Sequence, residues 1–188
     1  MPALGVYFIN SGKVKVVVKL PDGRETIVRI LGAGDMVGVP GKGEMGIHNF
    51  SAFTLEDSAL CFLGNKNLYA AWMENPVFLF NTMLYYFHEM RKVKIFANNL
   101  SCMNVREKVA HALILLNKIY GGQTINQKIH LNFPKNEIAK YCGTATEQIS
   151  RTLKKMGKEK IITTGAKEII IDDYHALEGI IANYPVAY

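Results

Sequence analysis

The sequence lacks the features that mark membrane and secreted chains. Among its 188 residues no apolar run reaches the length that a bilayer-spanning helix needs, about 18–20 residues. The first residues, Met-Pro-Ala-Leu-Gly-Val, lack the basic segment and the long apolar stretch of a secretory signal. These absences predict a cytoplasmic protein.

Cysteine is scarce, and no catalytic pattern is present. Cys61, Cys102 and Cys142 are odd in number and far apart, which does not support a disulfide framework, a zinc ribbon or an iron–sulfur cluster. We therefore expect buried or idle thiols, no metal and no cofactor. The sequence also has no Ser/His/Asp or Cys/His arrangement and no phosphate-binding glycine loop, so we do not expect an enzyme.

Charge is modest but unevenly distributed. The chain is 49% hydrophobic and 20% charged, an ordinary globular composition, and its formal net charge is +6. The segment from Lys135 to Lys160 holds seven cations and three anions. This excess suits a polyanionic partner, although a solvated helix face would show the same charge.

The first third of the chain has the alternation and turn signals of β structure. The expected strands are Gly5–Ile9, Lys13–Lys19, Glu25–Leu31, Phe50–Leu55 and Ala59–Leu63. Pro21-Asp22-Gly23 predicts a hairpin turn. The glycine-rich residues 38–46 predict a loop.

A long helix is expected next. Residues 77–103 contain neither glycine nor proline and follow Asn75-Pro76, a typical helix start. Apolar residues recur at spacings of four and three, the pattern of a helix that pairs with another helix. This expected dimer seam is Leu79, Met83, Tyr86, Met90, Val93, Ala97 and Leu100. A second apolar set is expected to pack on the β domain: Val77, Phe80, Leu84 and Phe87. Burial of the helix in a single core is the alternative.

Residues 135–157 fit a helix-turn-helix. Two helices, Lys135–Tyr141 and Thr144–Gly157, would meet at Gly143, where the turn requires a positive φ. Thr144 followed three residues later by Glu147 fits a capping box. Apolar residues would lock the pair: Ala139, where the helices cross, with Ile138, Ile149 and Leu153.

A β-hairpin is expected directly after this pair, at Ile161–Ile171, and Asp172-Asp173 would cap a final helix that ends near Asn183. An ordinary helical hairpin in a core is the alternative to a DNA-binding motif. A helix-turn-helix followed by a hairpin is the winged-helix arrangement, which favours DNA binding.

The chain resembles the cyclic-AMP receptor protein/fumarate–nitrate regulator (CRP/FNR) superfamily of bacterial transcription regulators. The resemblance lies in Tyr7–Val16, Asp22–Glu25, Leu31–Gly38, the long helix, Val105–Ala110 and the helix-turn-helix. It implies an α+β fold: an incomplete cyclic-nucleotide-binding-like β-roll in residues 1–74, a dimerisation helix in 75–103 and a winged helix-turn-helix in 104–188. The implied partners are double-stranded DNA, a second copy of the chain and RNA polymerase.

The second helix of the motif resembles the E-x-x-S-R recognition helix of the fumarate–nitrate regulator type. The resemblance implies that Glu147, Ser150 and Arg151 read a TTGAT-like half-site. The chemistry agrees, since Arg can bond guanine and Glu can accept from cytosine. The expected phosphate contacts are Thr144, Thr146, Gln148 and Lys154.

The effector site departs from the family pattern. Gly38 matches the nucleotide-binding loop, but Val39 stands where Glu is expected; Ser51 and Ala52 match, but Phe50 stands where Arg is expected. A buried phosphate without its cation is costly, so we expect no tight cyclic-AMP binding. An apolar effector would suit a pocket formed by Gly38, Val39, Ser51, Ala52, Phe80, Leu84 and Phe87. The phenylalanines could equally serve packing alone.

Three alternatives remain open at this stage. His48 and His88 could ligate haem, although a lone His is more often an ordinary surface or core residue. The family's roll normally begins several strands before Gly5, which implies either a reduced roll or a longer original chain. The rival function is a cyclic-nucleotide-type sensor whose C-terminal helices bind a protein partner.

Overall fold

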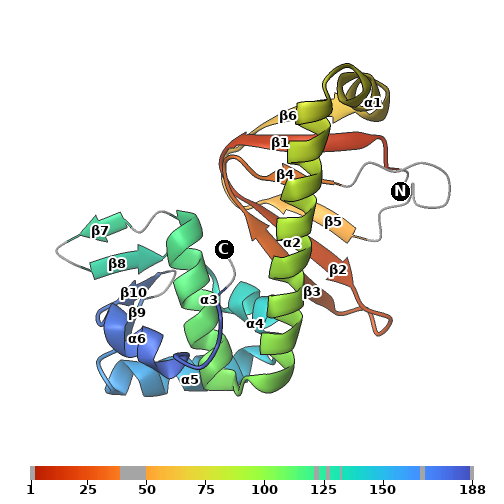
Figure 1. Cartoon of the computed structure of the whole chain (residues 1–188). Helices are drawn as coiled ribbons and strands as arrows, with labels where there is room; N and C mark the ends of the chain where they lie inside the picture. Colours follow the sequence, from red (N-terminus) through yellow and green to blue (C-terminus); the bar gives the residue numbers. More distant parts are fainter. Residues whose placement is uncertain are drawn as a thin grey trace. The chain divides into compact units, whose positions relative to one another are not determined.

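The computed structural model describes residues 3–38, 50–120, 123–125, 128–131, 133–165 and 168–186. The chain divides into two compact units, Met1–Arg91 and Lys92–Tyr188, called here the β unit and the helical unit (Figure 1). The expected α+β class, with strands first, a long helix next and a helix-turn-helix last, is confirmed.

The described part of the β unit contains six strands in two antiparallel sheets. They are β1 (Gly5–Ser11), β2 (Val14–Lys19), β3 (Glu25–Leu31), β4 (Met36–Val37), β5 (Phe50–Thr54) and β6 (Ala59–Gly64). The sheets have the orders β4-β1-β6 and β3-β2-β5, and Figure 1 shows one above the other. All five expected strands are confirmed to within two residues at each end. The two-residue β4 was not predicted, because so short a strand shows no alternation.

The core of the β unit lies between these sheets. Alternate residues of a strand point to the same face, so Val14 and Val16 of β2 point inward together. They cluster with Ile9, Leu31 and Val37, and all five are at most 5% exposed. The expected hairpin joins β2 to β3, pairing Lys19 with Glu25.

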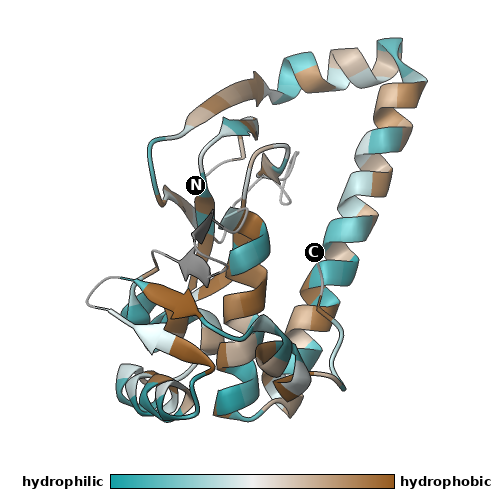
Figure 2. Cartoon of the chain, turned by 90° about the vertical axis from the view of Figure 1, so that its left-hand side faces the viewer, coloured by the Kyte–Doolittle hydropathy of each residue, from teal (hydrophilic) through white to brown (hydrophobic). Residues whose placement is uncertain are grey.

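Two helices follow the strands, α1 (Asn65–Glu74) and α2 (Pro76–Cys102). The long helix therefore begins at the predicted Asn75-Pro76, where the Asn75 side chain accepts a hydrogen bond from the Phe78 amide at 3.1 Å. Hydrophobic and hydrophilic segments alternate along α2 (Figure 2).

The expectation about which face of α2 packs on the β strands is wrong. Val77, Phe80, Leu84 and Phe87 are 39–68% exposed. The contacts come instead from polar residues: Tyr85 Oη accepts from the Met36 amide at 2.8 Å, and Glu89 forms an ion pair with Arg29. Apolar periodicity missed this face because its residues meet polar groups of β3 and β4.

The helical unit combines the last four helices with a four-stranded antiparallel sheet. The helices are α3 (Val105–Tyr120), α4 (Lys135–Cys142), α5 (Thr146–Lys158) and α6 (Tyr174–Ile180). The strands are β7 (Gln123–Ile125), β8 (Lys128–Leu131), β9 (Ile162–Thr164) and β10 (Ile169–Ile171), in the order β7-β8-β10-β9. The predicted hairpin is β9 and β10, whereas β7 was not predicted.

Helix α6 has the predicted cap. Asp173 accepts a hydrogen bond from the Ala176 amide at 2.8 Å, which satisfies one of the free amides of the first turn. The helix ends at Ile180, three residues before the expected end.

Helix α3 forms the centre of the helical unit. Val109, Ala110, Leu113, Ile114 and Leu116 are at most 2% exposed, and they pack against α4, α5 and α6. Because these helices share one apolar core, their solvent-facing residues are held in fixed positions. Within the described ranges, no helix has both the length and the apolar character needed to cross a bilayer.

Candidate nucleic-acid interface

The turn between α4 and α5 has the geometry of a helix-turn-helix. Gly143 adopts φ 60° and ψ 38°, the left-handed conformation that glycine accepts with little strain. The amides of Gly143 and Thr144 both donate to the carbonyl of Ala139, the latter at 3.1 Å. The chain therefore leaves α4 through a closed turn and enters α5 in a defined direction, as expected.

One face of α5 anchors the helix. Ile149, Leu153 and Met156 are at most 1% exposed, and Ile138 and Ala139 of α4 are buried beside them. The spacing of 149, 153 and 156 places the three α5 side chains on one stripe of the helix. The predicted apolar lock is confirmed, with Met156 as an addition that the sequence reasoning did not name.

The opposite face of α5 carries the predicted base-reading residues. Glu147, Ser150 and Arg151 are exposed, and they lie on one strip because their spacing is three and four residues. No hydrogen bond or ion pair within the described ranges occupies their side chains. Their polar groups are therefore available to an outside partner.

The predicted phosphate-contacting residues surround this strip. Thr146, Gln148 and Lys154 are exposed, and Thr144 is half-buried in the turn. The Thr144 hydroxyl donates a hydrogen bond to Oε1 of Gln148, so these two side chains are held together.

The capping-box expectation is wrong. The residue that caps α5 is Ala145, which has no side-chain acceptor, and the helix begins at Thr146. Thr144 lies one residue too early to cap, and Glu147 is therefore the second residue of the helix. Within the described part of the chain no group bonds the carboxylate of Glu147, which lies near the N-terminus of α5, where the helix dipole favours a negative charge.

The rest of α5 is strongly basic. It holds four cations, Arg151, Lys154, Lys155 and Lys158, against the single anion Glu147. Lys155, Lys158 and the following Lys160 are also exposed. These lysines belong to the charge excess noted in the sequence, but none of them was predicted as a DNA contact.

The β9–β10 hairpin stands next to α5 in the fold. Lys160 has a φ of 61°, unusual for a residue with a side chain, and it turns the chain from α5 towards β9. The Thr163 hydroxyl donates to Asp172 Oδ2 at 2.7 Å across the base of the hairpin. Helices α4 and α5 followed by this hairpin form a winged helix-turn-helix.

The predicted effector-pocket residues lie on separate elements of the β unit. The carbonyl of Gly38 is 3.5 Å from Tyr86 Oη. Ser51 and Ala52 are exposed on β5. Phe80, Leu84 and Phe87 are exposed on α2. Val39 and His48 lie outside the described residues, and His88 is exposed. The pocket stays a prediction.

The predicted dimer seam of α2 is largely solvent-facing in one chain. Met83, Met90 and Val93 are 46%, 68% and 46% exposed, and Ala97 is exposed as well. Leu79, Tyr86 and Leu100 are half-buried. The seam therefore offers apolar surface that one copy of the chain leaves in water.

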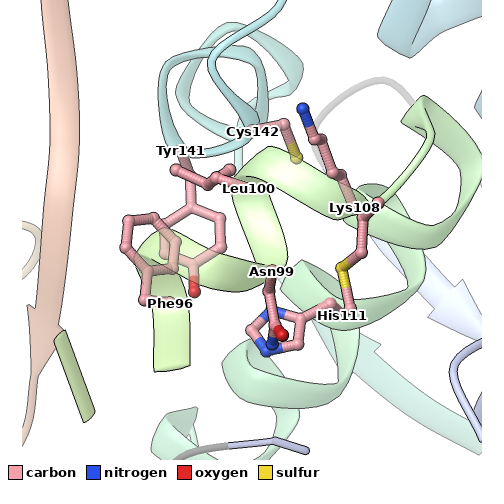
Figure 3. Close-up of a pocket in the computed structure, with 8 residues that line it drawn as sticks. Phe96, Asn99, Leu100, Lys108, His111, Tyr141 and Cys142 are labelled. Carbon is pink, nitrogen blue, oxygen red and sulfur yellow. The ribbon is translucent and has the colours of Figure 1, made fainter. Parts of the chain in front are cut away.

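The helical unit also holds a small aromatic pocket near the end of α2 (Figure 3). The rings of Phe96 and Tyr141 are 4.9 Å apart, and His111 stacks on Tyr141 at 6.5 Å. Burial lowers the pKa of His111 to about 4 and raises the pKa of Cys142 to about 12. His111 is therefore neutral at pH 7, and Cys142 is a buried thiol, one of the two outcomes that the sequence predicts for the cysteines.

The other two cysteines, Cys61 and Cys102, are exposed. Within the described ranges, no three His, Cys, Asp or Glu side chains gather as metal ligands would.

Two family models match this architecture. The model described as a cyclic nucleotide-binding domain matches residues 1–75, and the model described as a Crp-like helix-turn-helix domain matches residues 107–180. The two matched segments correspond to the strands of the β unit and to the winged helix-turn-helix.

Two known proteins illustrate the similarity in sequence. The cyclic AMP receptor protein of Thermus thermophilus is 26% identical over 175 residues, covering 93% of this chain and 78% of that protein. The probable transcriptional regulator flp of Lacticaseibacillus casei is 24% identical over 163 residues, covering 87% and 73%.

Solved structures share the fold. A CRP-family transcriptional regulator from Thermus thermophilus superposes with a TM-score of 0.85 at 23% identity, covering 99% of this chain and 91% of that one. FixK2 from Bradyrhizobium japonicum gives 0.81 at 22% identity, covering 96% and 88%. With both domain models matched in the family's order, the chain belongs to the CRP/FNR superfamily of transcription regulators.

Proposed function

We propose that the protein is a homodimeric regulator that recognises a palindromic TTGAT-like site and responds to a small effector other than cyclic AMP. In this proposal, residues 1–74 sense the effector, 75–103 form the dimer and 104–188 bind DNA. The observation that carries it is the division of α5 into a buried face with Ile149 and Leu153 and an exposed face with Glu147 and Arg151.

The exposed strip of α5 has the groups that base edges require. Arg151 can donate two hydrogen bonds to guanine O6 and N7, Glu147 can accept from the cytosine amino group, and Ser150 can do either. All three lie within the first two turns of the helix, the part that a recognition helix inserts into the major groove.

Backbone contacts would supply most of the affinity. Thr144, Thr146, Gln148 and Lys154 surround the strip at positions suited to phosphates. The basic C-terminal half of α5, with Lys155 and Lys158, strengthens the attraction. Binding of this kind weakens steeply with salt.

Dimerisation would pair the exposed apolar surface of α2 with that of a second copy. Met83, Met90 and Val93 are close to half exposed or more, and α2 runs for 27 residues. Val77, Phe80, Leu84 and Phe87 extend this surface along the first half of the helix. A two-fold axis along α2 would present two copies of α5 to half-sites about one helical turn apart.

The effector is proposed to be apolar. Val39 and Phe50 replace the two residues that hold the sugar and the phosphate in nucleotide-binding relatives, so a cyclic nucleotide would lose its ionic contact. Titration calorimetry with cyclic AMP is expected to show no binding in the micromolar range, and micromolar affinity would contradict this part of the proposal.

The test of DNA recognition is fluorescence anisotropy with the duplex TTGAT-NNNN-ATCAA and with a scrambled duplex of equal length. We expect binding that prefers the palindrome and falls as salt rises. Sedimentation of the Met90→Lys variant is expected to show monomers, because like charges would meet across the seam. Absence of salt-sensitive binding to either duplex would favour the rival function, in which the C-terminal helices bind a protein.

A further inference from the structure

An ion pair joins α3 to the end of α5, the second helix of the winged helix-turn-helix. Nη1 and Nη2 of Arg106 donate to Oε1 and Oε2 of Glu159 at 2.8 and 2.5 Å. The contact is bidentate, so it fixes direction as well as distance. It connects residues 53 positions apart in the sequence, from the first turn of α3 to the end of α5.

Both charges occupy the unfavourable end of their helix. Arg106 lies at the N-terminus of α3, where the dipole repels a cation, and Glu159 caps the C-terminus of α5, where the dipole repels an anion. Helix propensity and dipole therefore do not explain either residue. The pairing does, and it lowers the pKa of Glu159 and raises that of Arg106.

The α3 end of the pair is rigid. The Asn104 amide donates to Glu107 Oε2 at 2.8 Å, and the Glu107 amide donates to Asn104 Oδ1 at 3.1 Å, which closes a reciprocal capping box. Arg106 thus projects from a fixed helix end that is itself anchored by buried Val109 and Ala110.

The α5 end of the pair lies at the exit towards the hairpin. Directly after Glu159, Lys160 takes its φ of 61°, and its amide donates to the Gly157 carbonyl at 3.0 Å. The Ile161 amide then donates to the Met156 carbonyl at 3.1 Å. Met156 is the last buried apolar residue within α5, and beyond it the helix end is held by these backbone bonds, by the ion pair and by the buried Ile161 and Ile162 that follow.

We propose that Arg106 and Glu159 are positioning residues that set the angle at which α5 presents its base-reading side chains. This inference rests on the proposed DNA-binding function. Ser150 lies nine residues before Glu159, about 14 Å along the helix axis. The pair therefore sets the orientation of α5 from the end opposite to the base-reading residues. Without it, α5 pivots about its buried stripe and Glu147 and Arg151 shift relative to the bases.

The first variant is Arg106→Lys, which keeps the charge and removes the bidentate geometry. Affinity for the palindrome is expected to fall about three- to tenfold, while affinity for the scrambled duplex stays within about twofold. The salt slope should not change, because the number of cations is the same. Equal losses on both duplexes, or no loss on either, would overturn the proposal.

Two further variants separate geometry from charge. Glu159→Gln is expected to reduce the preference for the palindrome, and the double variant Arg106→Lys/Glu159→Gln should lose no more than the worse single one, since both break one contact. The exchanged pair Arg106→Glu/Glu159→Arg should restore part of the preference. Additive losses would overturn the proposal.

The matched control is Arg24→Lys in the β unit. Arg24 also pairs with a carboxylate, since its Nε is 2.7 Å from Asp22 Oδ2, but the contact is local to a hairpin turn. This variant is expected to bind both duplexes as the unchanged protein does.

A second readout does not depend on DNA. Amide hydrogen exchange at Lys160 and Ile161 is expected to accelerate about tenfold in Arg106→Lys and to stay unchanged in Arg24→Lys. If the unchanged protein shows no preference between duplexes, the proposed function fails, whereas the role of the Arg106–Glu159 pair is decided by hydrogen exchange. Unchanged exchange at both amides would overturn that role.

Discussion

The two units of this chain differ in how well their polar residues match the family pattern. In the helical unit, fold and chemistry agree: α5 is anchored by Ile149 and Leu153 and exposes Glu147 and Arg151. In the β unit the strands have a buried apolar core, but the sequence predicts that Phe50 stands where the family's phosphate-binding Arg is expected. A scaffold is kept by its apolar core, whereas a ligand site depends on a few polar residues that can be lost without unfolding it.

The same difference appears at the sheet edges. The edge strands β5 and β6 expose Phe53, Leu60 and Phe62 at 38–48%, and neither strand contains a charged residue. In the helical unit, the strands of the β9–β10 hairpin bury Ile162, Ile169 and Ile171 to 1%. Apolar side chains are thus more exposed on these two edge strands than on the hairpin strands of the helical unit.

The largest effect is expected from Ile149→Asp. An unpaired carboxylate in this fully buried position should cost about 4 kcal/mol or more, which is enough to unfold the helical unit. Amide exchange should lose its protection in α3, α4 and α5 and keep it in β1 and β2. The control is Ser150→Asp, whose exposed neighbouring position should leave the fold intact. Simultaneous loss of protection in both units would show that they are not separate folding units.

The parts of the fold that the sequence predicted are those with strong local patterns. Strong patterns were sufficient for five strands, for α2 and for the helix-turn-helix, because alternation reports which face is buried and a turn glycine reports where the backbone takes a positive φ. The α2 face that packs on the strands was missed because Tyr85 and Glu89 make polar contacts there. The cap of α5 was predicted wrongly because Thr144 belongs to the turn, where its amide donates to the Ala139 carbonyl, so the helix begins only at Thr146. The Arg106–Glu159 pair has no local signal, since its members are far apart in sequence.

A pH-dependent loss of stability is expected in the helical unit. The pKa of His111 is lowered by burial to about 4, while the unfolded chain protonates near its ordinary 6.5. Below pH 6.5 the unfolded state binds a proton that the folded state does not, so stability is complete above that pH and falls as pH drops towards 4. The loss should total about 3 kcal/mol.

Urea unfolding at pH 7.5 and pH 5.0 measures this effect, with His111→Phe as the comparison. Carboxylates titrate in both proteins and change the free energy of unfolding equally between the two pH values. Any difference in that change between the unchanged protein and His111→Phe therefore comes from the imidazole. Among the described residues His111 Nε2 has no hydrogen-bond partner, so replacing His111 by a ring of similar shape should not destabilise the protein at pH 7.5. An equal change in the free energy of unfolding in both proteins would contradict the lowered pKa of His111.

Two neighbouring cations of α5 should behave differently towards DNA. Arg151→Ala is expected to cost about 1–3 kcal/mol on the palindrome and to relax preference at one base pair. Lys154→Ala should weaken all duplexes alike and reduce the salt slope by about 1. Anisotropy titrations with single-base variants of the site, at several salt concentrations, distinguish them. If both variants only changed the salt slope, the base-reading role of Arg151 would be wrong.

The smallest loss of stability is expected from replacing one turn glycine in each unit. Gly143 and Gly34 both have positive φ, and an added Cβ would meet no atom within 4 Å at either. Substitution by Ala is therefore opposed by backbone strain alone, about 1–2 kcal/mol. Gly143→Asn should cost less than Gly143→Ala, because Asn tolerates the left-handed conformation that Gly143 adopts.

Thermal unfolding of the three variants decides whether the helical unit tolerates backbone strain differently from the β unit. The turn at Gly143 is closed by two amides that donate to Ala139, and the turn at Gly34 by the Gly34 amide donating to Ile9 at 2.9 Å. Both Ala variants are strained by the same positive φ, in turns closed by similar hydrogen bonds. The two variants should therefore lose comparable free energy of unfolding. A much larger loss at Gly143 would mean that the angle between α4 and α5, and not φ alone, is disturbed. In that case the same variant should also lose its preference for the palindrome.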